Sequence, residues 1–225
     1  MLPRVLLHSA VSADGRMDGF AADLGLYYDL AARFGADAIL AGSQTMLAAY
    51  ASVEPAPENA GKFEPSQQDP NDSRPLLVVV DSRGRIHNWS QIRNEPYWRG
   101  PVVLCSRVTP KAYLAHLQEQ QIDFVVTGDD HVDLRASLEE LNARYGVRVV
   151  RVDSGGTLNG VLLRAGLVDE VSLLIHPSLV GGTTPRSIFT APDLLSPEDV
   201  LRLKLAHVEQ MAGDTLWLRY QVIKA

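Results

Sequence analysis

Short apolar segments alternate with amphipathic ones along this chain as far as residue 175, and this alternation constrains the fold more than any other feature. The clearest apolar segments are Val5 to Val11, Leu76 to Asp81 and Val168 to Ile175. Such short, almost entirely apolar segments are typical of strands buried on both faces of a sheet. Helical patterns lie between them, for example in residues 23–35 and in the segment from Asp133 to Tyr145. The alternation predicts an α/β fold with a mainly parallel, twisted sheet flanked by helices.

The C-terminal part of the chain has a different pattern. Two strand-like segments, residues 202–211 and 215–224, are joined by Ala212-Gly213-Asp214. This is the signal of a β-hairpin, so we expect the last two strands to be antiparallel. We find no linker and no internal repeat, and residues 1–225 are therefore predicted to form one domain.

Residues 51–74 differ from the rest of this predicted domain. They are rich in Pro, Asn, Glu and Gln and show little periodicity. We interpret this segment as a loop insertion, and a lid and a mobile connection both remain open.

Local signals predict where some of the helices begin. Ser43 is expected to cap the helix that follows the strand Asp37 to Gly42. Thr109 is expected to cap another helix, with Pro110 at its first position. Residues 85–100 show no periodicity and are expected to be irregular.

The composition is that of an ordinary globular protein and excludes several classes of function. Hydrophobic residues make up 46% and charged residues 21% of the chain, and the formal net charge is −6. Lys and Arg are scattered, so we expect no nucleic-acid partner. No apolar stretch approaches the roughly 18 residues of a membrane span, and the N-terminus does not resemble a signal peptide. We therefore expect a cytoplasmic protein without a membrane partner.

The six histidines are dispersed, which argues against a metal site, and the single cysteine, Cys105, is expected to be buried and inert.

Residues 147–182 form the most informative unit, with the pattern strand, glycine turn, helix and strand. The first strand, Val147 to Val152, ends in the turn Asp153-Ser154-Gly155-Gly156-Thr157. Glycines at this place let a ligand approach the backbone, and the N–H groups that open the helix can bind a phosphate. A tight turn without a ligand is the alternative interpretation.

In parallel α/β sheets, ligands bind beyond the carboxyl ends of the strands. The predicted strand ends all carry small or polar residues: Ser12, Asp14 and Gly15; Gly42 to Thr45; Asp81 and Ser82; Ser106 and Arg107; Gly128; and Asp153 to Thr157. These residues suit backbone approach and hydrogen bonding to a small-molecule ligand.

Several of these segments together resemble the RibD C-terminal domain family, whose fold is that of dihydrofolate reductase. The matching segments are SADGRM at 12–17, ADAILAGSQT at 36–45, RPLLVVVDSRGRI at 74–86, VDL at 132–134, and the glycine turn with GLVDE and Pro177 to Gly182. The resemblance covers nearly the whole chain. It implies an NADPH-dependent reductase of the riboflavin pathway, which reduces the ribosyl carbon of a diaminopyrimidinone phosphate to a ribityl group. No zinc-binding H-x-E and C-x-x-C pair of a deaminase domain is present, so we expect a stand-alone reductase domain.

The resemblance also implies a set of site residues. Those that match the NADPH site are Ala10, Thr45, Ser82 and the run Gly155, Gly156, Thr157, Leu158, Asn159, Gly160 and Val161, and we add Gly15, Gly42 and Gly128 from the loops at the strand ends. For the substrate side, the predicted residues are Asp14, Arg16 and Asp153. Asp14 or Asp153 is expected to assist proton delivery, and Arg16 to hold substrate oxygens. For Asp14 the alternative is that it ties its own turn together, and for Arg16 that it is a solvated surface residue.

The chain departs from the family pattern at two places. Asp153 stands where the family usually carries a glutamate. Residues 46–51, MLAAYA, lack the acidic pair and the arginine that help to hold the substrate phosphate in the family, and Lys62, Arg74 and Arg83 are possible replacements. These departures keep a second hypothesis open, namely an NADPH-dependent reductase of another heterocyclic, carbonyl or imine substrate. A nucleotide-binding homodimer without turnover is a third. The family implies a homodimer, and the choice between NADPH and NADH stays open, with Arg83 and Arg107 as candidates for contacting a 2′-phosphate.

Overall fold

The computed structural model describes residues 1–51, 72–183 and 186–224. The chain divides into two compact units: unit 1 comprises Met1–Pro3 and Asp37–Arg148, and unit 2 comprises Arg4–Ala36 and Val149–Ala225. The prediction of one domain over residues 1–225 stays a prediction. Most of the predicted loop insertion at 51–74 lies outside the described residues.

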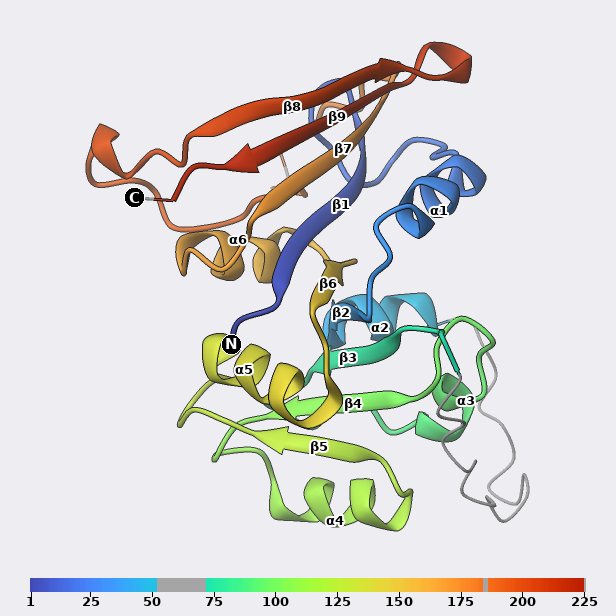
Figure 1. Cartoon of the computed structure of the whole chain (residues 1–225), viewed down its shortest axis with the longest axis vertical. Coiled ribbons are helices and arrows are strands. Elements are labelled where there is room, and N and C mark those ends of the chain that lie inside the picture. The colour runs from blue at the N-terminus through green and yellow to red at the C-terminus, as the bar shows by residue number, and fades with distance from the viewer. Residues whose placement is uncertain (52–71, 184–185, 225) are drawn as a thin grey trace. The chain divides into compact units, whose positions relative to one another are not determined.

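Unit 1 alternates strands with helices throughout (Figure 1). Its elements are β2 (Ala38–Gly42), α2 (Ser43–Ala49), β3 (Leu76–Val80), α3 (Trp89–Arg93), β4 (Pro101–Cys105), α4 (Lys111–Glu119), β5 (Asp123–Val126) and α5 (Leu134–Tyr145). The strands lie in the order β5-β4-β3-β2, and each neighbouring pair is parallel. The core includes Val79, Ile86, Trp89, Val103 and Leu117, whose side chains are almost completely buried.

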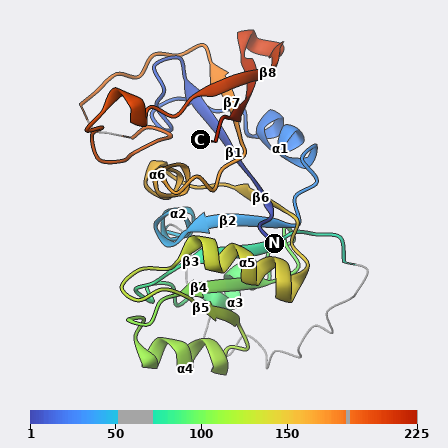
Figure 2. The same cartoon turned by 60° about the vertical axis from the view of Figure 1, so that its left-hand side comes forward.

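Unit 2 combines a parallel part with the antiparallel C-terminal strands. Its elements are β1 (Arg4–Ser12), α1 (Leu24–Ala32), β6 (Val149–Val152), α6 (Gly156–Arg164), β7 (Glu170–His176), the 3₁₀ turn Pro197–Asp199, β8 (Leu203–Gln210), the 3₁₀ turn Ala212–Asp214 and β9 (Leu216–Val222). The strand order is β6-β1-β7-β9-β8. β1 pairs in parallel with β6 and β7, whereas β9 is antiparallel to both β7 and β8. In Figures 1 and 2, α1 and α6 lie on opposite sides of β1, so helices cover both faces of this sheet.

The structure confirms the predicted fold class, because the strands as far as β7 are parallel within each unit and the last two form an antiparallel hairpin. Local capping explains why α5 begins and ends as expected. The Asp133 carboxylate accepts a hydrogen bond from the Ala136 N–H at 3.0 Å. At the other end, Gly146 adopts φ 68°, a left-handed conformation that favours glycine.

Two helices begin close to the predicted positions, but the predicted N-cap residues, Ser43 and Thr109, were each wrong by one position because their hydroxyls bond elsewhere. Gly42 is the N-cap of α2, and Ser43 is its first residue. The Ser43 hydroxyl instead accepts a hydrogen bond from the Arg85 guanidinium at 2.6 Å. The N-cap of α4 is Pro110, while the Thr109 hydroxyl bonds to neighbouring loop backbone.

The segment predicted to be irregular, residues 85–100, contains the short helix α3. This helix forms because Trp89 and Ile92 lie three residues apart and are both fully buried in unit 1. The Trp89 indole N–H also donates to the Tyr113 hydroxyl at 3.2 Å. A single helical turn is too short to show a periodic pattern in the sequence. Whether this helix forms depends on the burial of its side chains in the folded protein.

Cys105 is buried at the end of β4, as predicted, and burial raises the pKa of its thiol to about 12. No helix in the described part of the chain has the length and apolar character needed to cross a membrane.

Candidate functional site

In unit 2, most of the predicted site residues lie in the loop that follows β1, in the turn that follows β6, and in α6. β1 is followed by Asp14, Gly15 and Arg16, and β6 is followed by Asp153 and the glycine turn. Because β1 and β6 are parallel neighbours, with Leu7 opposite Val152, both loops leave the sheet in the same direction.

The Asp14 carboxylate ties together two loops of unit 2. It accepts hydrogen bonds from the Ser12 hydroxyl at 2.5 Å and from the backbone N–H groups of Val180 and Gly181 at 3.1 and 2.6 Å. These bonds hold its pKa at about 2. Gly15 has φ 79° and allows the tight turn that places Asp14 there. This geometry favours the alternative in which Asp14 holds its turn together, and a proton-delivery role stays a prediction.

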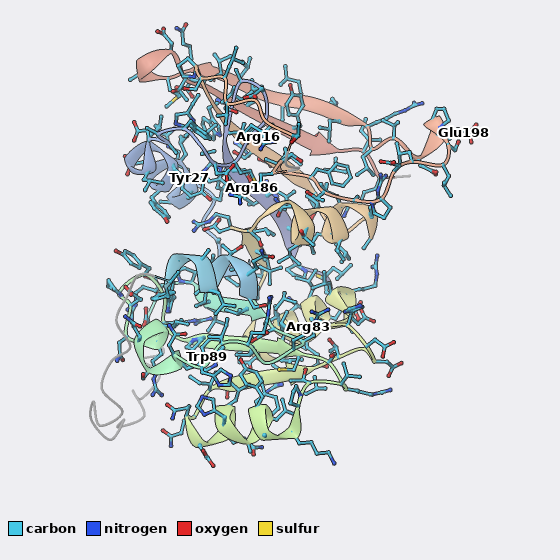
Figure 3. All side chains as sticks on the ribbon, turned by 180° about the vertical axis from the view of Figure 1, so that it is seen from behind. Arg16, Tyr27, Arg83, Trp89, Arg186 and Glu198 are labelled. Carbon is cyan, nitrogen blue, oxygen red and sulfur yellow. The ribbon has the colours of Figure 1, made fainter. Side chains whose placement is uncertain are left out.

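Arg16 lies where the loop after β1 meets residues 186–190. Its backbone N–H donates to the Ser12 hydroxyl at 2.9 Å, and Arg16 forms an isolated β-bridge with Ser187. The next residue, Met17, donates its N–H to the Arg186 carbonyl at 3.1 Å. Figure 3 labels Arg16, Arg186 and Tyr27 in the same part of unit 2. The Arg16 side chain is half-buried, and its substrate contact stays a prediction.

Asp153 has two partners that the sequence analysis missed. The Arg151 guanidinium binds its carboxylate through two bonds of 2.9 and 2.8 Å. The Tyr27 hydroxyl donates to the same carboxylate at 3.2 Å. Arg151 could have been found in the sequence, because a charged residue inside the apolar segment Val147 to Val152 must have a partner. Tyr27 carried no such signal.

The glycine turn divides into a ligand-accessible part and a packed part. Gly155 is the N-cap of α6 and, as a glycine, provides no side chain that could cap this helix. Apart from Gly155 itself and its two neighbours in the chain, no described residue has an atom within 4 Å of the position that a Gly155 Cβ would occupy. At Gly156 and Gly160, by contrast, a Cβ would lie 2.2 Å from the Ser187 carbonyl oxygen and 2.0 Å from the Thr190 carbonyl oxygen. These two glycines therefore let residues 187–190 pack directly on α6.

The other residues predicted to bind the cofactor in unit 2 have mixed environments. Asn159 is fully buried and donates to the Ser154 and Ile188 carbonyls at 3.3 and 3.0 Å, so it holds the turn and the packed segment together. Thr157 and Val161 are exposed, and Leu158 and Ala10 are half-buried. A cofactor contact for these residues stays a prediction.

In unit 1, the remaining predicted residues follow strand ends in the same way. Gly42 ends β2, Thr45 lies half-buried in the first turn of α2, and Ser82 follows β3. The Ser82 carbonyl accepts a hydrogen bond from the Thr109 hydroxyl at 2.8 Å. Gly128 follows β5 with φ 75°, and a Cβ there would lie 2.2 Å from the His131 carbonyl oxygen. The turn itself therefore requires a glycine at position 128, and the cofactor role of these four residues stays a prediction.

The structure is that of an α/β protein whose predicted site residues follow the carboxyl ends of parallel strands, where ligands bind in sheets of this kind. Residues 3–217 match the family model of the RibD C-terminal domain. The chain belongs to the RibD C-terminal domain family.

Named relatives agree with this assignment and with the predicted reductase class. The chain is 30% identical over 231 residues to the 2,5-diamino-6-ribosylamino-4(3H)-pyrimidinone 5′-phosphate reductase of Methanothermobacter thermautotrophicus, with 99% of each chain covered. It is 32% identical over 191 residues to the protein of the same name from Archaeoglobus fulgidus, covering 81% of this chain and 84% of that one.

The fold is also found in solved structures. One is form 1 of Acinetobacter baumannii RibD, with a TM-score of 0.73 and 23% identity over 99% of this chain. The match spans 59% of the length of that protein. A second is the riboflavin biosynthesis reductase Rib7 of Saccharomyces cerevisiae, with a TM-score of 0.65 and 19% identity over 99% of this chain and 90% of that one.

Proposed function

We propose that this protein is an NADPH-dependent reductase of 2,5-diamino-6-ribosylamino-4(3H)-pyrimidinone 5′-phosphate. The observation that carries the proposal is the 30% identity to a reductase of that name, over 99% of both chains. In the proposed reaction, the ribosyl carbon of the substrate is reduced and a ribityl chain is formed.

The start of α6 fits the pyrophosphate of a dinucleotide. The first N–H groups of a helix have no partner within the helix, and together with the helix dipole they attract an anion. Gly155, the N-cap of α6, has no side chain that could bond to these groups, and the space beside it is open in the described structure. Gly155 and the N–H groups of the first turn of α6 would therefore hold the phosphates.

The polar groups proposed for the substrate side are Asp153 and Arg16. When bound, a nicotinamide cofactor supplies the hydride. The Asp153 carboxylate would accept a hydrogen bond from a donor group of the substrate, and the Arg16 guanidinium would donate hydrogen bonds to substrate oxygens. Asp14 contributes indirectly, because it fixes the loop on which Arg16 lies.

Of the three residues considered as replacements for the missing phosphate-binding arginine, Arg74 is already engaged. Its guanidinium binds the Asp72 carboxylate at 2.7 Å and also donates to the Pro96 carbonyl at 3.3 Å. Lys62 lies outside the described residues. Arg83 is exposed in the loop after β3, and we propose it as a phosphate ligand in unit 1, for the substrate or for the 2′-phosphate of NADPH.

We further propose that the protein is a cytoplasmic homodimer. The support for self-association is strand β8, which lies at one edge of its sheet and exposes Leu203, Leu205 and Val208. An apolar edge strand of this kind pairs readily with a second copy. Light scattering at several protein concentrations tests this part, and a monomer at all of them contradicts it.

The experiment that tests the function is an NADPH oxidation assay with the pyrimidinone phosphate substrate, after titration of the protein with NADPH and NADH. We expect NADPH to bind more tightly than NADH and to be oxidised only when the substrate is present. Arg135→Leu, at an exposed arginine of α5, serves as a control with unchanged activity. NADPH binding without turnover would shift the assignment to another substrate or to a non-catalytic protein. No binding of either cofactor would refute the reductase.

A further inference from the structure

Arg151 is a buried charge on a strand of unit 2. It lies on β6 opposite Leu6, and its side chain is 9% exposed. Burying a guanidinium is costly unless the charge is paired and hydrogen-bonded. The structure provides that partner two residues further on, because side chains two apart in an extended segment point to the same side, and Asp153 receives both bonds.

The hydrogen bonds to the Asp153 carboxylate are unevenly distributed between its two oxygens. Oδ1 accepts from Arg151 Nε at 2.9 Å and from the Tyr27 hydroxyl at 3.2 Å. Oδ2 accepts from the second guanidinium nitrogen of Arg151 at 2.8 Å. Each carboxylate oxygen can accept two bonds, so Oδ1 is fully used and Oδ2 retains one position for a further donor. The side chain of Asp153 is 21% exposed, which leaves this oxygen accessible to a ligand.

We propose that Arg151 and Tyr27 are positioning residues, which clamp the Asp153 carboxylate so that Oδ2 accepts a hydrogen bond from an amino or hydroxyl group of the substrate. The inference rests on the proposed reductase function. In this arrangement Asp153 acts as a fixed acceptor that orients the substrate, and the bidentate guanidinium defines the plane of the carboxylate. Arg151 and Tyr27 do not touch the substrate themselves.

Tyr27 is itself held in place by a buried chain of hydrogen bonds. Its ring stacks on His8 with 4.4 Å between ring centroids. Its hydroxyl oxygen lies 3.1 Å from the His8 carbonyl oxygen, so its single hydrogen is shared between that carbonyl and Asp153 Oδ1. His8 Nε2 lies 3.1 Å from the Tyr27 carbonyl, and Nδ1 lies 3.0 Å from the Ser172 hydroxyl. The Ser172 oxygen in turn accepts from the Trp217 indole at 2.9 Å.

The directions of these bonds follow from chemistry. A carbonyl can only accept, so His8 Nε2 carries the proton, and Nδ1 then accepts from the Ser172 hydroxyl. Burial lowers the pKa of His8, which favours this neutral form in the folded protein. Two charged groups also act on the pKa of His8: Asp153 raises it and Arg151 lowers it. A neutral imidazole with two hydrogen bonds gives the Tyr27 ring, which stacks on it, a rigid support.

A double-mutant cycle on kcat/KM tests the inference, with Arg151→Leu, Asp153→Asn and the double variant. Because Arg151 acts only through Asp153, we expect each single change to lower kcat/KM by about 10- to 100-fold and the double variant to be no worse than Asp153→Asn. Arg151→Lys keeps the charge but cannot form two parallel hydrogen bonds to the carboxylate, so its kcat/KM should lie between those of the wild type and Arg151→Leu. Tyr27→Phe should lower kcat/KM less than Arg151→Leu does. NADPH affinity should stay within twofold in all variants, and Arg135→Leu is the control for the loss of an arginine charge.

Urea unfolding of the same variants gives a readout that does not depend on activity. We expect a positive coupling between Arg151 and Asp153 in the unfolding midpoints. If Arg151→Leu lowers only stability while KM and kcat of the folded enzyme stay unchanged, Arg151 is purely structural and the inference is overturned. Additive effects on kcat/KM overturn it as well. A wild-type protein without NADPH turnover instead refutes the proposed function, and the substrate role of Asp153 fails with it.

Discussion

The glycine turn offers the sharpest prediction, because neighbouring glycines have different tasks in the structure. In Gly160→Ala, the new methyl group would lie 2.0 Å from the Thr190 carbonyl oxygen, and in Gly156→Ala 2.2 Å from the Ser187 carbonyl oxygen. Both oxygens belong to the backbone, so no side-chain rotation relieves the contact. Residues 187–190 would have to move away from α6 by about 1 Å or more.

The expected loss in the free energy of unfolding of Gly160→Ala follows from three contributions. Overpacking costs about 1–3 kcal/mol. The displaced segment also loses the bonds from Thr190 N–H to the Gly156 carbonyl and from Asn159 to the Ile188 carbonyl, both 3.0 Å long, at about 1 kcal/mol each. Alanine is the better helix former by about 1 kcal/mol, which offsets part of this loss. We expect Gly160→Ala to lower the free energy of unfolding by roughly 2–4 kcal/mol.

Urea unfolding followed by circular dichroism measures this change, and Gly155→Ala is the matched control. Gly155 has φ −76° and ψ 171°, which alanine adopts without strain, and the space around it is open in the described structure. Gly155→Ala should therefore keep or raise stability, by up to about 1 kcal/mol, because alanine restricts the unfolded chain. It should weaken NADPH binding, however, because its methyl group occupies the space proposed for the phosphates.

Two results would refute this reasoning. If Gly160→Ala were as stable as the wild type, residues 187–190 would not pack on α6 as described. If Gly155→Ala bound NADPH as tightly as the wild type, the open space beside Gly155 would not be the phosphate site.

Three further predictions concern titratable groups. Burial lowers the pKa of His8 from its ordinary value of 6.5. As the pH falls below about 6.5, the unfolded chain therefore binds a proton at His8 while the folded chain does not. The free energy of unfolding should therefore decrease with falling pH, and His8→Gln should show a smaller decrease; equal slopes would contradict a neutral His8. Asp14, whose pKa is held at about 2 by the Ser12 hydroxyl and two backbone N–H groups, should contribute stability that is complete above about pH 4 and lost towards pH 2. Asp14→Asn should flatten this acid limb of a stability profile, and an unchanged limb would argue against the Asp14 contacts. Cys105 should not react with a thiol reagent in the native protein but should react in urea, since burial raises its pKa to about 12; rapid native reaction would contradict its burial.

The fold class and the family could be predicted from the sequence because both depend on local patterns. Burial on both faces of a strand demands a short apolar segment, and a cap such as Asp133 bonds to a residue only three positions away. The same holds for Gly146, whose left-handed conformation ends α5. Where the cap contact is tertiary, as for Ser43 with Arg85, the local signal predicted the wrong residue.

The environment of the site, in contrast, was decided by tertiary structure. The sequence places Asp153 and the glycines correctly after β6, but Tyr27 reaches Asp153 across 126 positions of sequence. Similarly, the glycines of α6 are divided into packed and open positions by residues 187–190, which approach from beyond β7. The sequence alone determines which residue types stand at the strand ends, because burial and turn chemistry act over a few residues. Only the folded chain decides which of them are already engaged with a partner, because hydrogen bonds and steric contacts join residues that are distant in sequence.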